Sequence, residues 1–173
     1  MFFVIIMIEW VVVHQDSDTR RHIVKDKIKV LFVCVHNSAR SQMAEALLNH
    51  MAGDRFTAQS AGLQPEALNP LAVEVMREIG IDISRNETKS AFDFYKRGAL
   101  FNYVVTVCDE TQAERCPIFP GHAQKVHRSF PDPAALTGAD SDKIEKTREI
   151  RDQIKSWLED WVKEVRESGN GKN

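Results

Sequence analysis

The sequence lacks the features that mark membrane proteins, nucleic-acid-binding proteins and secreted disulfide-rich domains. Its 173 residues contain no run of about 20 apolar residues, the length that a membrane span needs. The 23 Lys+Arg and 25 Asp+Glu leave a net charge of −2, which provides no broad positive field for a nucleic acid. Three cysteines are an odd number, which argues against a disulfide framework and for thiols kept reduced in the cytoplasm.

What the sequence does contain fits one globular domain with extra residues at its amino terminus. Hydrophobic residues make up 43% of the chain and charged residues 28%, which are globular proportions. The first residues form an apolar run around Glu9, followed by a densely polar stretch, without the positive start and small-residue end of a secretory signal. We expect residues 1–26 to form an appendage outside the fold, with an extra strand as the alternative. Residues 27–168 are expected to form the domain, and residues 169–173 a flexible tail.

From Lys27 onward, strand patterns alternate with helix patterns. Apolar runs predict strands over residues 28–33, 56–60 and 103–107, with a short fourth strand over 126–130. Helical spacing predicts helices over residues 43–51, 70–79 and 144–165, the second capped by Asn69. This alternation indicates an α/β sandwich around a parallel sheet, whose ligands bind beyond the carboxyl ends of the strands. Cys34 and Cys108 both follow such ends, so both thiols are expected to face one crevice.

The segment from Cys34 to Ser41 is the main candidate for chemistry, because it has the form Cys, five residues, Arg, Ser between a buried strand and a helix. Such a loop can turn backbone N–H groups inward, and the helix dipole adds partial positive charge, so a tetrahedral oxyanion fits there. Arg40 offers a planar fork for two of its oxygens, and the same field favours the thiolate of Cys34. The expected oxyanion-binding residues are Val35, His36, Asn37, Ser38, Ala39, Arg40 and Ser41, the last also donating a hydrogen bond to the sulfur. The alternative is a buried cysteine that merely ends a strand.

Asp132 is the candidate general acid. It lies between two prolines on a stiff turn after the fourth predicted strand, which would hold one carboxylate at a fixed place. Attack on a tetrahedral oxyanion expels hydroxide or alkoxide, and an acid must protonate that group as it leaves. Because Asp-Pro is also a common turn dipeptide, a purely structural role is the alternative.

Together these motifs resemble the cytoplasmic arsenate reductases built on the low-molecular-weight tyrosine phosphatase fold. The resemblance runs in order from about Lys27 to the end of the chain, through residues 33–45 (VCVHNSARSQMAE), 60–62 (SAG), 69–70 (NP), 105–109 (VTVCD), 116–117 (CP) and 130–133 (FPDP). It implies a three-layer sandwich in which helices flank a four-stranded parallel sheet, with arsenate bound in the loop after Cys34. It also implies that Cys34 is the nucleophile, Arg40 the oxyanion ligand and Asp132 the general acid.

Two further cysteines distinguish a reductase from a phosphatase. Reducing As(V) to As(III) takes two electrons, which thiols can supply by ending as a disulfide. The resemblance implies that Cys108 attacks the Cys34–arsenic adduct and that Cys116 then attacks Cys108. Two bonded cysteines need Cα atoms within ~4.4–6.8 Å, whereas eight positions along an intact helix span about 12 Å, so the segment between them would have to rearrange. The alternative is that Cys108 is a core residue and Cys116 a loop thiol.

The expected function is therefore a monomeric, cytoplasmic arsenate reductase that is recycled by thioredoxin or a similar dithiol protein. It is expected to bind no nucleic acid, membrane or cofactor, and no close-spaced Cys/His pairs suggest zinc. Relatives can bind potassium through a serine, an asparagine and two acids; Asn37, Glu45 and Ser60 match, but no second acid is found around residues 88–90, so no metal is expected. A low-molecular-weight protein tyrosine phosphatase and a non-catalytic oxyanion-binding module are the alternatives.

Overall fold

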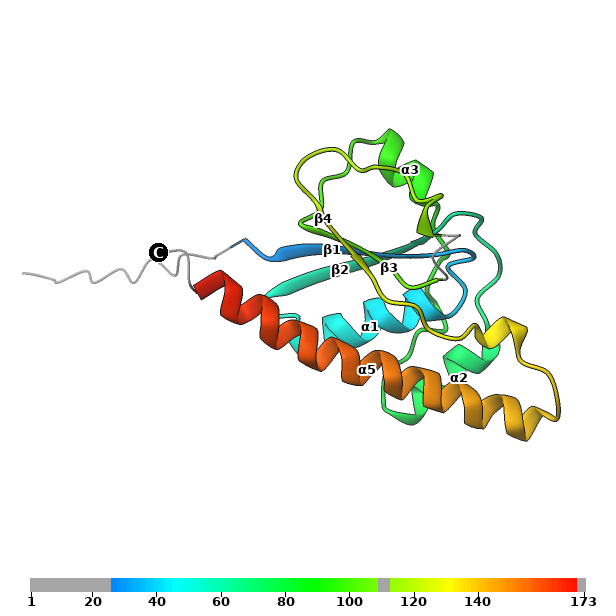
Figure 1. Ribbon diagram of the computed structural model, residues 1–173. Helices are drawn as coiled ribbons and strands as arrows, with labels where there is room; N and C mark the ends of the chain where they lie inside the picture. The colour runs from blue at the N-terminus through cyan, green and yellow to red at the C-terminus, as the bar shows by residue number, and fades with distance from the viewer. Residues whose placement is uncertain (1–25, 109–112, 171–173) are drawn as a thin grey trace, which may run out of the picture.

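The computed structural model describes residues 26–108 and 113–170 (Figure 1). The expected amino-terminal appendage therefore lies almost entirely outside the described residues, as does the end of the expected tail, and both stay predictions. Within the described part of the chain, no helix is both long enough and apolar enough to cross a membrane.

Four parallel strands form one sheet in the order β2–β1–β3–β4. They are β1 (Ile28–Cys34), β2 (Phe56–Gly62), β3 (Tyr103–Thr106) and β4 (Gln124–His127). β1 pairs with a neighbour on each side, and its residues from Val30 to Cys34 are buried, as its continuous apolar run predicts. β4 overlaps the predicted strand 126–130 but begins earlier, at Gln124, and ends earlier, at His127. Its bounds follow pairing with β3 and not hydrophobicity, because it is an edge strand of mostly exposed residues.

Helices cover both faces of the sheet, which confirms the three-layer α/β sandwich (Figure 1). On one face lie α1 (Arg40–Ala52), α2 (Pro70–Glu78) and α5 (Asp140–Asn170). On the other lies α3 (Ala91–Lys96), which the sequence patterns did not predict because it has only six residues. Since side chains alternate along a strand, β1 contributes Val30 and Phe32 to the first face and Leu31 and Val33 to the second.

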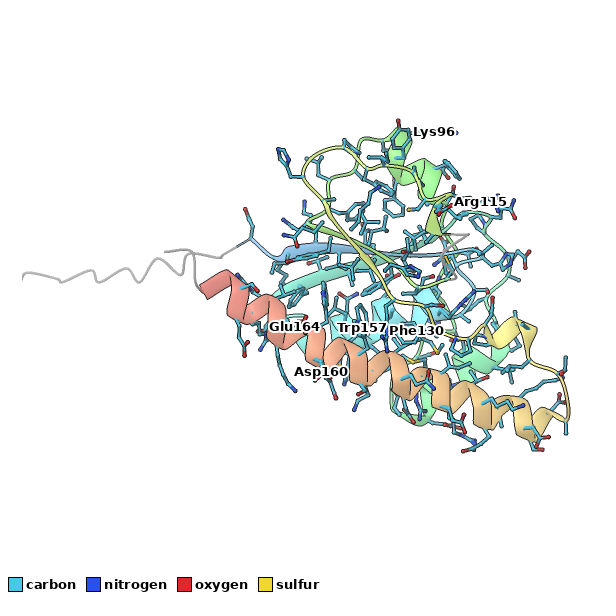
Figure 2. The ribbon with its side chains drawn as sticks, viewed as in Figure 1. Lys96, Arg115, Phe130, Trp157, Asp160 and Glu164 are labelled. Atoms are coloured by element: carbon cyan, nitrogen blue, oxygen red, sulfur yellow. The ribbon has the colours of Figure 1, made fainter. Side chains whose placement is uncertain are left out.

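The apolar stripe of α5 packs as its spacing predicts and also supports the turn that follows β4. Ile154, Leu158 and Trp161 of the stripe are buried. Trp157 meets Phe130 edge to face with ring centroids 6.1 Å apart, and Figure 2 shows these two side chains together where the chain passes α5. Aromatic pairs of this geometry stabilise packing beyond simple burial. The segment that carries Asp132 is thereby held against the core.

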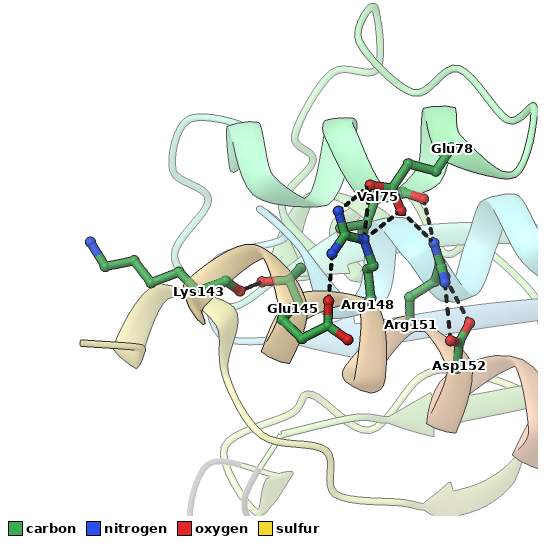
Figure 3. A network of polar contacts seen from close by, with 8 residues as sticks. Val75, Glu78, Lys143, Glu145, Arg148, Arg151 and Asp152 are labelled. Carbon is green, nitrogen blue, oxygen red and sulfur yellow. Dashed lines mark hydrogen bonds and ion pairs between the residues drawn. The ribbon is translucent and has the colours of Figure 1, made fainter. Parts of the chain in front are cut away.

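A network of ion pairs fastens the end of α2 to α5 (Figure 3). Glu78 accepts hydrogen bonds from Arg148 Nε at 2.9 Å and from Arg151 Nη1 at 3.2 Å. The buried Arg151 also donates to the backbone oxygen of Val75 at 2.8 Å. The hydrogen bond from Arg148 is the largest reason why the pKa of Glu78 lies below its ordinary value of 4.5. The carboxylate form of Glu78 is therefore stabilised by folding.

Replacing Glu78 with Gln should lower the free energy of unfolding at neutral pH, because it removes a charge that both arginines contact. A lowered pKa means that the contribution is complete above about pH 4.5 and is lost as the pH falls further. We expect the difference between wild type and Glu78→Gln, measured by urea unfolding at several pH values, to shrink in that acidic range. Asp160→Asn, on an exposed part of α5, is the control. A difference that stays constant down to pH 3 would contradict the role of the ion pairs.

Candidate active site

The loop between β1 and α1 is built so that its backbone N–H groups face inward. The carbonyl oxygens of Cys34, Val35, His36 and Ser38 all accept hydrogen bonds of 2.8–3.1 Å from N–H groups of residues 63–69. A planar peptide points its N–H opposite to its C=O, so the N–H groups of the following residues point toward the centre of the loop. The amino terminus of α1, with Arg40 as its first residue, opens at the same place. This arrangement suits a tetrahedral oxyanion.

Two residues with special backbone requirements let the loop close this tightly. A Cβ atom on Gly62 would lie 2.8 Å from Asn37 N and 2.9 Å from Val35 O, so only glycine fits against the loop. Asn37 itself has a φ of 53°, in the left-handed region that asparagine tolerates better than most residues.

The sulfur of Cys34 lies within this loop and is buried. The backbone N–H of Asn37 donates to it at 3.1 Å, and Ser41 Oγ lies 2.9 Å away. The structure thus brings Ser41 to the place where it was expected. Two hydrogen-bond contacts and the amino terminus of α1 therefore meet at this sulfur.

Asn37 is the centre of a polar network that includes Gln42 and Lys89, which the sequence patterns did not place there. Its side-chain oxygen accepts from the backbone N–H of Lys89 at 2.7 Å and from Gln42 Nε2 at 3.3 Å. Its side-chain nitrogen donates to Ser41 Oγ and Ser60 Oγ, both at 2.9 Å. All hydrogen-bonding positions of the buried amide are therefore used, which fixes its orientation. Gln42 and Lys89 carry no local signal, because only the folded chain brings them to the loop.

Arg40 and Asp132, which are 92 positions apart, meet at the mouth of the loop. The buried guanidinium of Arg40 donates through Nη1 to the backbone oxygen of Phe130 at 3.1 Å and through Nη2 to the carboxylate of Asp132. The other carboxylate oxygen of Asp132 accepts from the N–H of Ala134 at 3.0 Å, which caps the short 3-10 helix η1 (Pro133–Ala135). Asp132 therefore both caps the turn at η1 and contacts Arg40 beside the loop.

Cys108 and Cys116 lie on different faces of the sheet. Cys108 follows β3 and is buried in the same cluster as Cys34, on the side of α1, α2 and α5. Cys116 is half-buried and packs against the opposite cluster, where it lines a cavity of about 610 Å³ beside β3 and β4. All three cysteines are thiols. Sequence reasoning placed Cys108 at the strand end but gave no information on the face that Cys116 occupies.

Burial raises the pKa of the Cys116 thiol to about 11. The nearby cation of Lys125 opposes this rise, and a thiolate at Cys108 adds to it. Cys116 is therefore protonated near neutral pH in this position, and it becomes a nucleophile only where water or a cation can stabilise its charge.

Comparison with known proteins identifies the family. Residues 29–170 match the model of the low molecular weight phosphotyrosine protein phosphatases. The chain belongs to this family. The match covers the sheet, the loop after Cys34 and α5, and it confirms the resemblance found in the sequence.

Within this family, the similar proteins include arsenate reductases. An arsenate reductase of Bacillus subtilis is 38% identical over 135 residues, which cover 77% of this chain and 94% of that protein. A solved thioredoxin-dependent arsenate reductase of Corynebacterium glutamicum has a TM-score of 0.62 at 33% identity, covering 83% of this chain and 64% of that one. A structure described as an arsenate reductase in reduced state also has a TM-score of 0.62, at 26% identity, covering 80% of this chain and 98% of that one.

The raised pKa of Cys116 predicts slow alkylation of this thiol. In the reduced protein, iodoacetamide should modify Cys116 more slowly than a cysteine in an unstructured peptide at about pH 8, because less thiolate is present. The rate, followed by peptide mass spectrometry, should still be rising at about pH 10. The same protein in urea is the control and should react like the peptide. A rate that levels off near pH 9 in the folded protein would contradict the burial argument.

Proposed function

We propose that this protein reduces arsenate to arsenite, using Cys34, Cys108 and Cys116 in turn. The observation that carries the proposal is the burial of Cys108 in the same cluster as Cys34, at the end of the strand beside β1. An oxyanion loop and an acid would suffice for a phosphatase, whereas a second thiol on the same side of the sheet serves reduction. The names of the similar proteins support the same activity.

In the first proposed step, arsenate binds to the inward N–H groups of residues 35–41 and to Arg40. Arg40 uses two of its five N–H donors on Phe130 and Asp132, which leaves the others for the anion. The thiolate of Cys34 attacks arsenic and forms a sulfur–arsenic bond, while one oxygen leaves as hydroxide. Asp132 donates the proton that turns this hydroxide into water.

In the second proposed step, the thiolate of Cys108 attacks the sulfur of Cys34. The sulfur–arsenic bond breaks with its electron pair on arsenic, so As(V) becomes As(III) and arsenite leaves, while the two sulfurs form a disulfide. Cys116 then attacks Cys108, Cys34 departs as a thiolate, and a Cys108–Cys116 disulfide remains. A dithiol protein of the thioredoxin type reduces this bond, as the name of the Corynebacterium glutamicum relative indicates for that enzyme.

This order of steps requires Cys116 to move. It packs on the face opposite to Cys34, and burial keeps its thiol protonated there. Leaving its cavity would both bring its sulfur toward Cys108 and allow it to ionise. The rearrangement expected from the spacing of the two cysteines is therefore part of the proposal. So are the monomeric state and the cytoplasmic location, where thiols stay reduced.

A tyrosine phosphatase is the second candidate, because the family and the set Cys34, Arg40 and Asp132 fit it equally well. Residues that follow Asp132 argue against a phenyl-ring substrate. Pro133 and two alanines form η1, and Leu136 follows, so this side of the described loop offers no aromatic wall.

A steady-state comparison tests the proposed function. Arsenite production should be measured with thioredoxin, thioredoxin reductase and NADPH, and hydrolysis of an aryl phosphate should be measured beside it. We expect arsenate-dependent NADPH oxidation with at most weak hydrolysis. Hydrolysis without arsenite would instead establish the phosphatase, and neither activity would leave an oxyanion-binding module.

Cysteine variants separate the two activities. Cys108→Ser should abolish arsenate reduction while leaving aryl phosphate hydrolysis intact, because hydrolysis needs no second thiol. Cys116→Ser should release about one arsenite per chain and then stop with a Cys34–Cys108 disulfide, detected by peptide mapping. Turnover that continues in Cys108→Ser with thioredoxin would show that an external thiol resolves the arsenic adduct.

Asp132→Asn should lower kcat by roughly 10²–10⁴-fold if this residue protonates the leaving oxygen. The amide can still cap η1 but cannot donate the proton. Rates should be measured by arsenite release and by aryl phosphate hydrolysis, with Asp140→Asn as the control at an acid whose side chain is 98% exposed. Equal rates in the two variants would reduce Asp132 to a turn residue.

A further inference from the structure

We propose that the ammonium group of Lys89 is a positioning group for Cys34, acting through Glu45 on a chain of hydrogen bonds that ends at the sulfur. The inference rests on the proposed role of Cys34 as nucleophile. No contact joins the lysine to the sulfur directly, so its effect must pass through the side chains between them.

The chain of contacts is continuous from the lysine to the sulfur. Lys89 Nζ lies 3.4 Å from a carboxylate oxygen of Glu45, and Ser60 Oγ donates to the same oxygen. Asn37 Nδ2 then lies 2.9 Å from Ser60 Oγ and 2.9 Å from Ser41 Oγ. Ser41 Oγ lies 2.9 Å from Cys34 Sγ. These six side chains come from β1, the loop, α1, β2 and the segment before α3.

The charge of Glu45 sets the direction of the hydrogen bond from Ser60, and the amide of Asn37 sets the direction of the bonds to the two serines. A carboxylate only accepts hydrogen bonds, so the hydroxyl group of Ser60 donates its one hydrogen to Glu45. Ser60 Oγ can then only accept the hydrogen bond from Asn37. The amide nitrogen of Asn37 donates to both serines, because its oxygen already accepts from Lys89 N and Gln42. Ser41 Oγ therefore accepts a hydrogen bond from Asn37, and its own hydroxyl group donates to Cys34. A donated hydrogen bond stabilises the thiolate over the thiol.

Lys89 is the ion-pair partner of this carboxylate and is held firmly in place. Its side chain is 32% exposed and that of Glu45 only 18%, so the pair is largely removed from water. The backbone of Lys89 is fixed twice, by its N–H on Asn37 and by its carbonyl, which accepts from Gly62 N at 2.7 Å. A carboxylate this buried is costly without a cation. Without the ammonium group, Glu45 would lose its ion-pair partner and could turn toward solvent, and Ser60 would be released to donate to other partners.

Lys89→Met tests this role, because it removes the charge and keeps both backbone contacts of residue 89. Lys96→Met is the matched control, since Lys96 lines the same surface hollow of about 600 Å³ and loses the same charge. Lys89→Arg keeps the charge and should restore the function. The readouts are the rate of Cys34 alkylation by iodoacetamide at neutral pH, and kcat and KM for arsenate. The alkylation rate needs no turnover, so it tests Lys89 even where the proposed reductase activity fails.

We expect Lys89→Met to lower the alkylation rate of Cys34 and kcat together by roughly 3- to 30-fold, with a smaller change in KM. Lys96→Met should leave alkylation unchanged, and Lys89→Arg should recover most of the loss. Ser60→Ala should give a similar loss, and combining it with Lys89→Met should add little, because both changes interrupt the same chain. Equal alkylation rates in Lys89→Met and Lys96→Met, or fully additive losses with Ser60→Ala, would overturn the proposal.

Discussion

The site depends on where the carbonyl oxygens of the loop after Cys34 are bonded. A peptide can aim its N–H at an anion only if its C=O, which points the other way, has a partner behind it. Residues 63–69 supply these partners. The same segment leads into α2, where Asn69 both donates its N–H to Ser38 and caps the helix through Leu71 N at 2.9 Å. α2 in turn is fastened to α5 by Glu78, so a surface ion network supports the geometry of the loop from behind.

α5 also supports the opposite side of the site. Phe130 packs against Trp157 of this helix, and the backbone oxygen of Phe130 accepts from Arg40. The turn that carries Asp132 is thus placed by the contact of Phe130 with α5 and by two hydrogen bonds from Arg40. A single long helix therefore positions both the segment behind the oxyanion loop and the carboxylate in front of it.

The sequence was sufficient where local patterns decide the structure. The apolar run of β1 and the stripe of α5 predicted these elements, and the position of Cys108 after a strand agrees with its burial in the same cluster as Cys34. The extent of β4 and the presence of α3 could not be predicted, because pairing with β3 and packing on the sheet decide them. The contacts of Gln42 and Lys89 with Asn37 were missed for the same reason. Gln42 and Lys89 have ordinary side chains in sequence, and only the folded chain brings them together.

The sheet itself gives an order to the three thiols in the proposed reaction. Cys34 and Cys108 lie on one face of the sheet, so Cys108 is on the same side as the arsenic adduct that forms on Cys34. Cys116 lies on the other face, protonated by burial, and cannot compete for the adduct while it stays there. If all three thiols shared one crevice as thiolates, Cys116 could compete with Cys108 for the sulfur of the Cys34 adduct. Because Cys116 lies on the other face, Cys108 reacts first with the Cys34 adduct, and this separation gives the proposed sequence of disulfides its direction.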